Sequence, residues 1–231
     1  EGARLLLLCS PHNPVGRVWT ADELRAVLAI AHRHELTVLA DEIHHDLVYP
    51  GRRHTALATL AGDPSDIVTT VAPSKTFNIP GLGLSALVVP DPARRAALNR
   101  VLGELHVGAG NPFGIAAFVA AYRAGGPWLD ALLAYLAGNR DRVLDFVADR
   151  LPGIRAVVPE GTYLIWLDCR GLGLDDAALK AFFVGQARVG MNPGITFGSG
   201  GSGFMRLNLG TPRAVVAEAL ERIAGALGKL P

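Results

Sequence analysis

Short, almost wholly apolar runs separated by a helical segment constrain the fold of this chain more than any other sequence feature. Leu5–Cys9, Leu36–Ala40 and Ile67–Val71 are such runs, and an amphipathic helix is predicted over residues 21–34 between the first two. Thr20 and Glu23 have the spacing of a capping box at the start of that helix. Strands without polar alternation are buried on both faces, so the pattern predicts an α/β fold with a mostly parallel sheet covered by helices.

The second half of the chain predicts a long helix and a smaller α/β unit. The helix runs from Pro127 to Leu151 and is stopped by Pro152-Gly153. The other predicted elements are strands over residues 84–89, 154–158, 163–168 and 204–209, and helices over residues 92–106, 111–122, 175–188 and 212–227. We therefore predict two domains, residues 1–125 and residues 126–231, the second comprising the interdomain helix and a small C-terminal domain.

Composition excludes several classes of partner. The 231-residue chain has a net charge of +1 with no basic cluster, which argues against nucleic acid and against a membrane surface as partners. Leu5–Cys9 is far shorter than the ~20 residues that span a bilayer. Two distant cysteines, Cys9 and Cys169, favour buried thiols in a reducing cytoplasm over a disulfide framework.

Polar residues follow three of the predicted strands. Asn13, Asp41 and Lys75 each come just after the carboxyl end of one. Ligands of open α/β sheets gather at that edge, so these side chains are expected to face one crevice.

Each of these residues also has an ordinary structural interpretation. Lys75 is either an exposed loop lysine or an amine that forms a covalent bond with an aldehyde cofactor. Asp41 is either a solvated loop residue or a paired buried charge, and a pyridine cofactor needs such a carboxylate to keep its ring nitrogen protonated. Asn13, in an Asn-Pro-x-Gly turn, is either a turn residue or a hydrogen-bond donor to the ring of such a cofactor.

Arg206 interrupts an apolar strand, Phe204-Met205-Arg206-Leu207-Asn208. An arginine inside a strand is expected to meet a carboxylate through paired charge-assisted hydrogen bonds. That carboxylate belongs either to a structural ion pair or to an amino-acid substrate.

Two further motifs carry no site. His44-His45-Asp46 does not predict a metal site, because adjacent histidines point apart and no second ligand cluster has zinc-like spacing. The glycine-rich run 198–203 lacks the ending of a nucleotide-binding loop and precedes a strand, so we interpret it as a flexible loop before Arg206.

Taken together, the motifs resemble the pyridoxal-phosphate (PLP) enzymes of fold type I, in the class I/II aminotransferase superfamily. The motifs that carry the resemblance stand in the family's order along nearly the whole chain: His12-Asn13-Pro14-Val15-Gly16-Arg17, Ala40-Asp41-Glu42-Ile43-His44, Pro73-Ser74-Lys75-Thr76-Phe77-Asn78 and Arg206-Leu207-Asn208-Leu209. Asp-Glu-Ile-His, Thr-Phe-Asn and the segment Pro159–Arg170 look like the cystathionine β-lyase or C–S lyase branch.

The resemblance implies an aspartate-aminotransferase-like fold with an incomplete large domain, and a role for each site residue. Lys75 would be the catalytic lysine that bonds to PLP, and Asp41 the partner of the ring nitrogen. Asn13 and His44 would lie near the ring hydroxyl, and Arg206 would bind the substrate carboxylate. The family's N-terminal segment is expected before Glu1, so this chain alone is expected to be inactive, and the whole protein is expected to be a homodimer.

Two positions depart from the family pattern. Ala72 stands where relatives often carry a phosphate-binding serine, and Gly83 where many aminotransferases carry a phosphate-binding arginine that the lyase branch commonly lacks. The resemblance therefore implies a lyase that acts on cysteine-type amino acids such as L-cystathionine and gives a thiol, pyruvate and ammonia. An aminotransferase and a non-catalytic domain of a regulator remain as alternatives.

Overall fold

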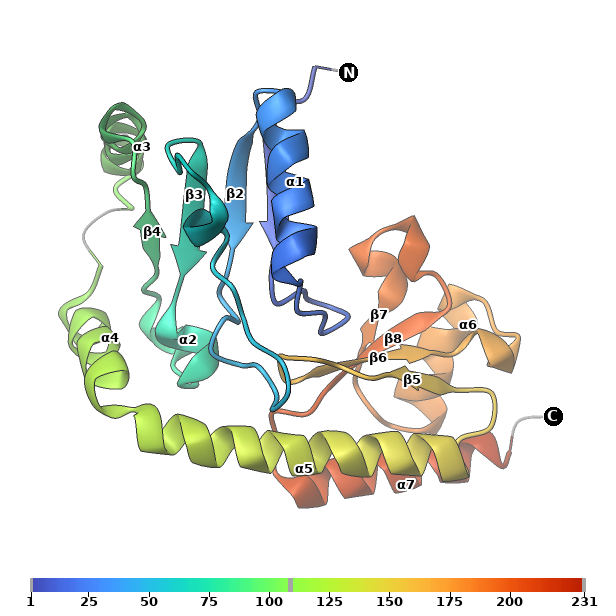
Figure 1. Ribbon diagram of the computed structural model, residues 1–231. Coiled ribbons are helices and arrows are strands. Elements are labelled where there is room, and N and C mark those ends of the chain that lie inside the picture. The colour runs from blue at the N-terminus through green and yellow to red at the C-terminus, as the bar shows by residue number, and fades with distance from the viewer. Residues whose placement is uncertain (1, 108–109, 230–231) are drawn as a thin grey trace. The chain divides into compact units, whose positions relative to one another are not determined.

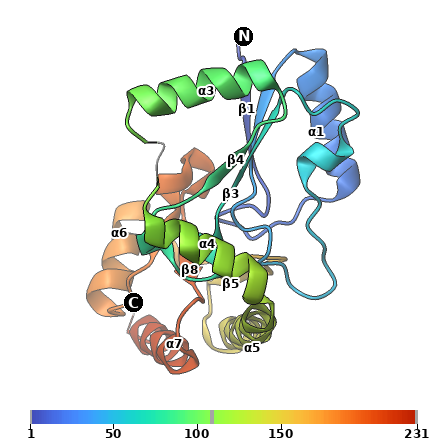
Figure 2. The same ribbon diagram turned by 90° about the vertical axis from the view of Figure 1, so that its left-hand side faces the viewer.

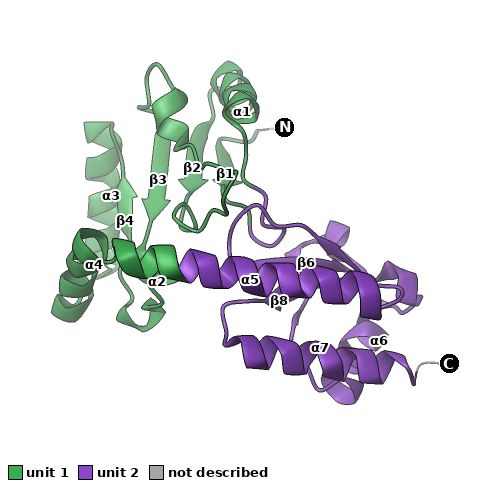
Figure 3. Cartoon of the chain, turned by 60° about the horizontal axis from the view of Figure 1, so that its bottom comes forward, with its two compact units in different colours: residues 1–12, 18–131 green, residues 13–17, 132–231 purple. Residues whose placement is uncertain are grey.

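The computed structural model describes residues 2–107 and 110–229, and the chain divides into two compact units (Figure 3). Unit 1 comprises residues 1–12 and 18–131, and unit 2 comprises residues 13–17 and 132–231. The division falls within the long helix α5 (Gly126–Arg150), which the sequence predicts almost to the residue. The domain boundary between residues 125 and 126 stays a prediction.

Unit 1 is built on a four-stranded sheet of order β1-β2-β3-β4. Its helices and strands are, in chain order, β1 (Leu5–Cys9), α1 (Ala21–Arg33), β2 (Thr37–Asp41), β3 (Ile67–Val71), α2 (Pro73–Thr76), β4 (Ala86–Val88), α3 (Pro92–Glu104) and α4 (Pro112–Ala124). β1, β2 and β3 are parallel, and β4 is antiparallel to β3. The predicted α/β class with a mostly parallel sheet is confirmed, although β4 is shorter than the predicted strand.

The helices of unit 1 begin where the sequence predicts. At α1 the Glu23 amide donates to the Thr20 hydroxyl at 3.3 Å and the Thr20 amide to the Glu23 carboxylate at 2.8 Å, which completes the capping box. Leu24 and Ala31 of α1 are buried against β2. Asp91 and Asn111 cap α3 and α4 (Figure 2), each by accepting from the amide three residues on.

The carboxyl ends of β2 and β3 point toward α2 (Figure 1). The sequence predicts a loop around Lys75, but residues 73–76 form a single helical turn instead. Pro73 occupies the first helical position, where its missing N–H is not needed. Lys75 is therefore held on a helical turn at this edge of the sheet.

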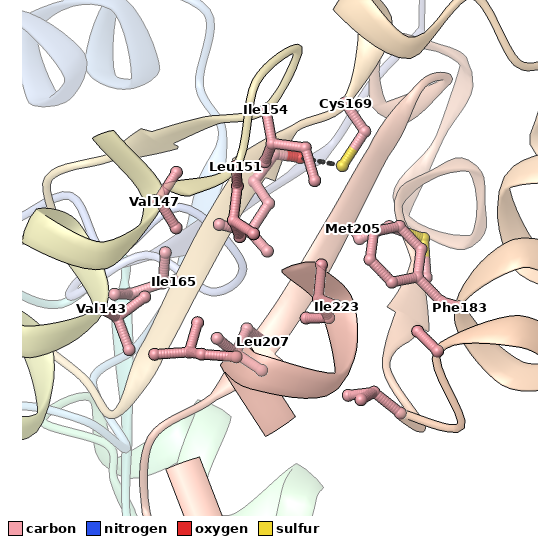
Figure 4. Packing of buried hydrophobic residues seen from close by; sticks show 14 of the residues in the cluster. Val143, Val147, Leu151, Ile154, Ile165, Cys169, Phe183, Met205, Leu207 and Ile223 are labelled. Carbon is pink, nitrogen blue, oxygen red and sulfur yellow. Dashed lines mark hydrogen bonds between the residues drawn. The ribbon is translucent and has the colours of Figure 1, made fainter. Parts of the chain in front are cut away.

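Unit 2 carries a separate antiparallel sheet of order β5-β6-β8-β7. Its elements after α5 are β5 (Arg155–Val157), β6 (Leu164–Asp168), α6 (Asp176–Ala181), β7 (Asn192–Pro193), β8 (Phe204–Asn208) and α7 (Arg213–Leu227). Apolar side chains of α5, β6, β8 and α7 converge in its core (Figure 4), among them Val143, Ile165, Met205 and Ile223. The small α/β unit is thus as predicted.

One predicted helix of unit 2 is wrong in length. Residues 175–188 do not form one α-helix, because α6 ends at Ala181 and continues as a π-helical turn, Phe182–Gln186. Phe182 and Phe183 are both fully buried, with 1% and 0% of their surface exposed. A regular helix turns adjacent side chains ~100° apart, and the wider turn lets both rings enter the core.

Candidate active site

Asp41 ends β2 in the middle of the parallel strands. In the strand register it pairs with Cys9 of β1 and Thr70 of β3, and its side chain is half-buried. Its Oδ1 accepts from the Ile43 amide at 3.2 Å and from the Thr70 hydroxyl at 3.3 Å. Its other oxygen has no hydrogen-bond partner among residues 2–107 and 110–229, so one carboxylate oxygen remains free for a ligand.

Lys75 lies at the same edge of the sheet as Asp41, because β2 and β3 are parallel neighbours and α2 follows β3 at once. Its side chain is half-buried. In the part of the chain that the structure describes, its amine forms no hydrogen bond or ion pair. A half-buried lysine residue without a counter-ion is unlike an ordinary surface lysine, which is exposed or paired.

The segment after β2 places His44 in a buried turn with 3% of its surface exposed. The turn is held by Glu42, which is itself 4% exposed. Glu42 Oε1 accepts from the Leu57 amide at 2.8 Å, and Oε2 lies 3.0 Å from His54 Nε2. A buried carboxylate with both oxygens satisfied is a stable structural anchor.

Asp46 forms a second anchor that sequence analysis did not identify. Its Oδ2 accepts from the hydroxyls of Thr76 at 3.0 Å and Tyr122 at 3.4 Å, and its Oδ1 lies 3.2 Å from His45 Nε2. The contacts with Thr76 and Tyr122 span 30 and 76 positions of the chain. No local pattern could have indicated them.

No group of three or more His, Cys, Asp or Glu residues that could hold a metal ion occurs among the described residues.

Ser10, which directly follows β1, is another residue that the sequence analysis did not single out. Its amide donates to the Asp41 carbonyl at 3.0 Å, which places it beside the carboxyl end of β2. Its Oγ is buried and has no hydrogen-bond partner within the described residues. A buried hydroxyl without a partner is costly unless a ligand satisfies it.

Arg206 is the centre of a separate constellation in unit 2. It lies in β8, opposite Trp166 of β6 and Asn192 of β7. Its Nη1 donates to Asn13 Oδ1 at 2.6 Å and its Nη2 to Asn192 Oδ1 at 2.9 Å. The Phe197 ring lies 4.8 Å from the guanidinium carbon, a cation–π contact.

The partners of Arg206 leave its positive charge uncompensated. Its hydrogen bonds go to neutral amides, and it forms no ion pair with any residue that the structure describes. Its Nε is buried without a partner. Burial lowers the pKa of Arg206, and the electrostatic interaction with Tyr163 raises it. Burial raises the pKa of Tyr163, and the electrostatic interaction with Arg206 lowers it. Among the described residues, Arg206 therefore does not form the structural ion pair that was one of its two interpretations. The N–H groups of its guanidinium that have no partner suit an incoming carboxylate.

The turn that carries Asn13 is fixed by a second turn of unit 2. Gly16 has a φ of +74°, and an added Cβ there would lie 2.5 Å from the Cβ of Pro159. The Gly16 carbonyl accepts from the amides of Glu160 and Gly161 at 2.8 and 3.0 Å. Only glycine fits this approach, so the Asn-Pro-Val-Gly sequence has a packing reason beyond turn formation.

The two departures noted in the sequence have plain structural settings. Ala72 is buried, with 2% of its surface exposed, and has no side chain that could donate a hydrogen bond. Gly83 adopts a left-handed conformation, φ +57° and ψ +39°, after the 3-10 turn Pro80–Leu82. That conformation favours glycine over a residue with a Cβ such as arginine.

The structure thus groups the predicted residues into two sets. Asp41, His44 and Lys75 belong to unit 1, whereas Asn13 and Arg206 belong to unit 2 and are joined by a hydrogen bond. Each set has the chemistry expected of part of a site for an aldehyde cofactor and an amino acid.

A half-buried lysine at the edge of a parallel sheet, with an aspartate on the next strand, is typical of PLP-dependent enzymes of the aspartate-aminotransferase fold. The family described as aminotransferase class I and II matches residues 1–223, and this chain belongs to that family. The predicted family and fold are thereby confirmed.

Several relatives are named as lyases, and others, at 31% and 32% identity, are named as aspartate aminotransferases. Cystathionine beta-lyase PatB of Bacillus subtilis (strain 168) is 43% identical over 224 residues, which are 96% of this chain and 58% of PatB. Crystalline cystalysin from Treponema denticola, which contains pyridoxal 5'-phosphate, is 38% identical with a TM-score of 0.96 over 99% of this chain and 58% of its own. The PLP-bound C-S lyase from Staphylococcus hominis is 33% identical, with a TM-score of 0.91 over 99% and 60% of the two chains. The present chain thus spans less than two thirds of the length of these relatives.

Among the helices of the described residues, none is both long and apolar enough to cross a membrane.

Proposed function

We propose that the whole protein is a PLP-dependent carbon–sulfur β-lyase that acts on cysteine-type amino acids such as L-cystathionine and releases a thiol, pyruvate and ammonia. The observation that carries the proposal is the similarity to PatB, at 43% identity over 96% of the chain. The chain covers only part of the length of its relatives, so the activity is proposed for the whole protein and not for this chain alone.

The residues of unit 1 fit PLP. The Lys75 amine has no partner within residues 2–107 and 110–229 and would bond to the aldehyde carbon of the cofactor. The Asp41 oxygen that has no partner among the described residues would accept a hydrogen bond from the protonated ring nitrogen and keep it protonated, and His44 would lie near the ring hydroxyl. When bound, PLP supplies an electron sink for the negative charge that develops on the substrate Cα.

Arg206 would bind the α-carboxylate of the substrate. The N–H groups of its fork that Asn13 and Asn192 leave unused are the donors available, since these two asparagines hold the guanidinium in a fixed orientation. Lys75, released from the cofactor when the substrate amine takes its place there, would take the proton from the substrate Cα, as an amine is a competent general base when desolvated. As the C–S bond breaks, the sulfur would leave Cβ as a thiolate that takes up a proton, and hydrolysis of the remaining product would give pyruvate and ammonia.

The alternative function is an aminotransferase, which the family description includes. The left-handed Gly83 favours the lyase, because glycine stands where many aminotransferases carry a phosphate-binding arginine. Ala72 provides no side-chain donor for the phosphate, which weakens the binding expected at that position.

The reaction can be decided with L-cystathionine and PLP. We expect the whole protein to form pyruvate from L-cystathionine with no keto acid present, measured by coupling to lactate dehydrogenase. Turnover that depends on an added keto-acid acceptor would instead establish the aminotransferase. We expect Lys75→Ala to remove the visible absorption band of bound PLP, whereas Lys180→Ala, at an exposed helical lysine, retains it.

The proposal also covers the oligomeric state of the whole protein and its location in the cell. By analogy with the family, the whole protein would be a homodimer, which analytical ultracentrifugation can test. Cys9 and Cys169 are not joined in a disulfide, which suits the cytoplasm. Burial raises the pKa of the Cys169 thiol to about 12, so this cysteine is expected to stay protonated and unreactive.

A further inference from the structure

The helical turn that carries Lys75 cannot hold its own shape. α2 contains four residues, and its closing hydrogen bond joins the Phe77 amide to the Pro73 carbonyl at 2.8 Å. One turn of helix fixes several backbone dihedrals for one hydrogen bond, which is unfavourable without outside support. The conformation of Lys75 therefore depends on what holds its neighbours.

Thr76, the residue directly after Lys75, provides such support. It is fully buried, and its hydroxyl donates to Asp46 Oδ2 at 3.0 Å. A hydrogen bond to a carboxylate is about twice as strong as one between neutral groups. Asp46 follows β2, so this contact ties α2 to the segment that also contains His44.

The Asp46 carboxylate is held in turn by two other groups. The Tyr122 hydroxyl of α4 lies 3.4 Å from Oδ2, and His45 Nε2 lies 3.2 Å from Oδ1. Burial, together with the charge of Asp46 and the hydrogen bond to it, raises the pKa of Tyr122, so this hydroxyl remains a donor. His45 Nδ1 lies 2.7 Å from the Glu42 carbonyl, which restricts the ring.

The other side of α2 is packed by aromatic rings. Phe77 meets Tyr122 edge-on at 5.4 Å and Trp128 at 5.8 Å. A Cβ at Gly125 would lie 2.4 Å from the Phe77 ring, so α4 ends in a glycine where this ring approaches. Thr76 and Phe77 thus hold α2 from two directions, and Tyr122 takes part in both.

We propose that Asp46 is a positioning residue for Lys75. Asp46 accepts a hydrogen bond from the Thr76 hydroxyl and thereby fixes the helical turn from which the Lys75 side chain extends. Asp46 itself need not touch substrate or cofactor. The functional meaning of this role rests on the proposed function, because a fixed lysine matters only if its amine reacts.

Thr76 offers the sharpest test, because valine has nearly the shape of threonine without its hydroxyl. We compare Thr76→Val, Thr76→Ser and Asp46→Ala in the whole protein, with Thr59→Val as the matched control. Thr59 donates to the Ala56 carbonyl in the exposed 3-10 turn Leu57–Leu60, outside this network. Two quantities are measured: hydrogen exchange of the peptide over residues 72–79, and the rate of attachment of PLP to Lys75, trapped by borohydride and read by mass spectrometry.

We expect Thr76→Val and Asp46→Ala each to raise exchange of the Phe77 and Ile79 amides about tenfold and to slow attachment of PLP to Lys75 about tenfold. Thr76→Ser should restore both quantities, and Thr59→Val should leave both unchanged. The double variant should be no worse than Asp46→Ala alone, since Asp46→Ala already removes the contact that Thr76→Val removes.

Several outcomes would overturn the positioning role. One is a rate of amide hydrogen exchange over residues 72–79 that is the same in Thr76→Val as in the wild type. Another is an equal rise of exchange throughout β2 and β3, which would indicate a general loss of stability. A wild-type protein that never attaches PLP to Lys75 would instead refute the proposed function, while the exchange comparison would still decide whether Asp46 holds the turn.

Discussion

Arg206 donates an N–H to Asn13 Oδ1 at 2.6 Å although 193 positions of the chain separate the two residues. The contact lies within unit 2 and joins β8 to the turn that Gly16 fastens to residues 159–161. Because asparagine is neutral, it orients the guanidinium without cancelling its charge. This is the property expected of an arginine that must receive a carboxylate from outside.

Replacement of Arg206 by lysine tests the proposed carboxylate site. We expect Arg206→Lys to raise KM for L-cystathionine about 100-fold, because an ammonium group cannot hold two asparagines and a carboxylate in one plane. Steady-state kinetics of pyruvate release measure the change. Arg222→Lys, at an exposed arginine paired with Glu218, is the control. An unaltered KM in Arg206→Lys would remove Arg206 from the site.

Phe197 is expected to contribute through its ring. Phe197→Leu removes the cation–π contact with Arg206 while keeping an apolar side chain, and we expect KM to rise about three- to tenfold. The matched control is Phe146→Leu, which removes the similar contact between Phe146 and Arg150 at 5.0 Å. Equal effects of the two substitutions on KM would show that the ring does not act through Arg206.

Two adjacent glycines in the run before β8 should respond very differently to alanine. An added Cβ at Gly201 would lie 2.0 Å from the Gly194 carbonyl oxygen, whereas one at Gly200 would have no atom within 4 Å. We expect Gly201→Ala to destabilise unit 2 by about 1–3 kcal/mol. Gly200→Ala should be nearly neutral. Thermal unfolding of both variants measures the difference, and similar melting temperatures would contradict the close approach.

Asp168 should contribute to stability against acid. Hydrogen bonds from Arg170 hold the pKa of Asp168 below its usual value, with burial acting in the opposite direction. The unfolded state then binds the proton more readily, so the contribution is present above the ordinary pKa of about 4 and is lost as the pH falls below it.

We expect Asp168→Asn to be less stable than the wild type at neutral pH and to approach it in acid. The effect should be small and reduced by salt, because the Arg170 side chain is 66% exposed. Urea unfolding at neutral pH and near pH ~3 measures it, with Asp149→Asn at an exposed aspartate of α5 as the control. A constant difference between Asp168→Asn and wild type over the whole range would contradict the assignment.

The sequence by itself determined what depends on neighbours in the chain. The strands that end at Cys9, Asp41 and Val71 follow from apolar runs, and the start of α1 follows from the spacing of Thr20 and Glu23. Placement of Asp41 and Lys75 at one edge needed only the rule that parallel strands share an edge. The family motifs then predicted which chemistry these residues serve.

Only the tertiary structure decided which side chains meet across long stretches of chain. No periodic signal in the sequence marks the hydrogen bond that Arg206 donates to Asn13 or the hydrogen bonds that Asp46 accepts from Thr76 and Tyr122. The same is true of the close backbone approach between Gly194 and Gly201. The π-helical turn after α6 arises likewise from packing, since two adjacent phenylalanines must both enter the core. Such contacts are set by close packing of distant segments, and this determines whether Arg206 keeps its charge available and whether Lys75 stands on a fixed turn.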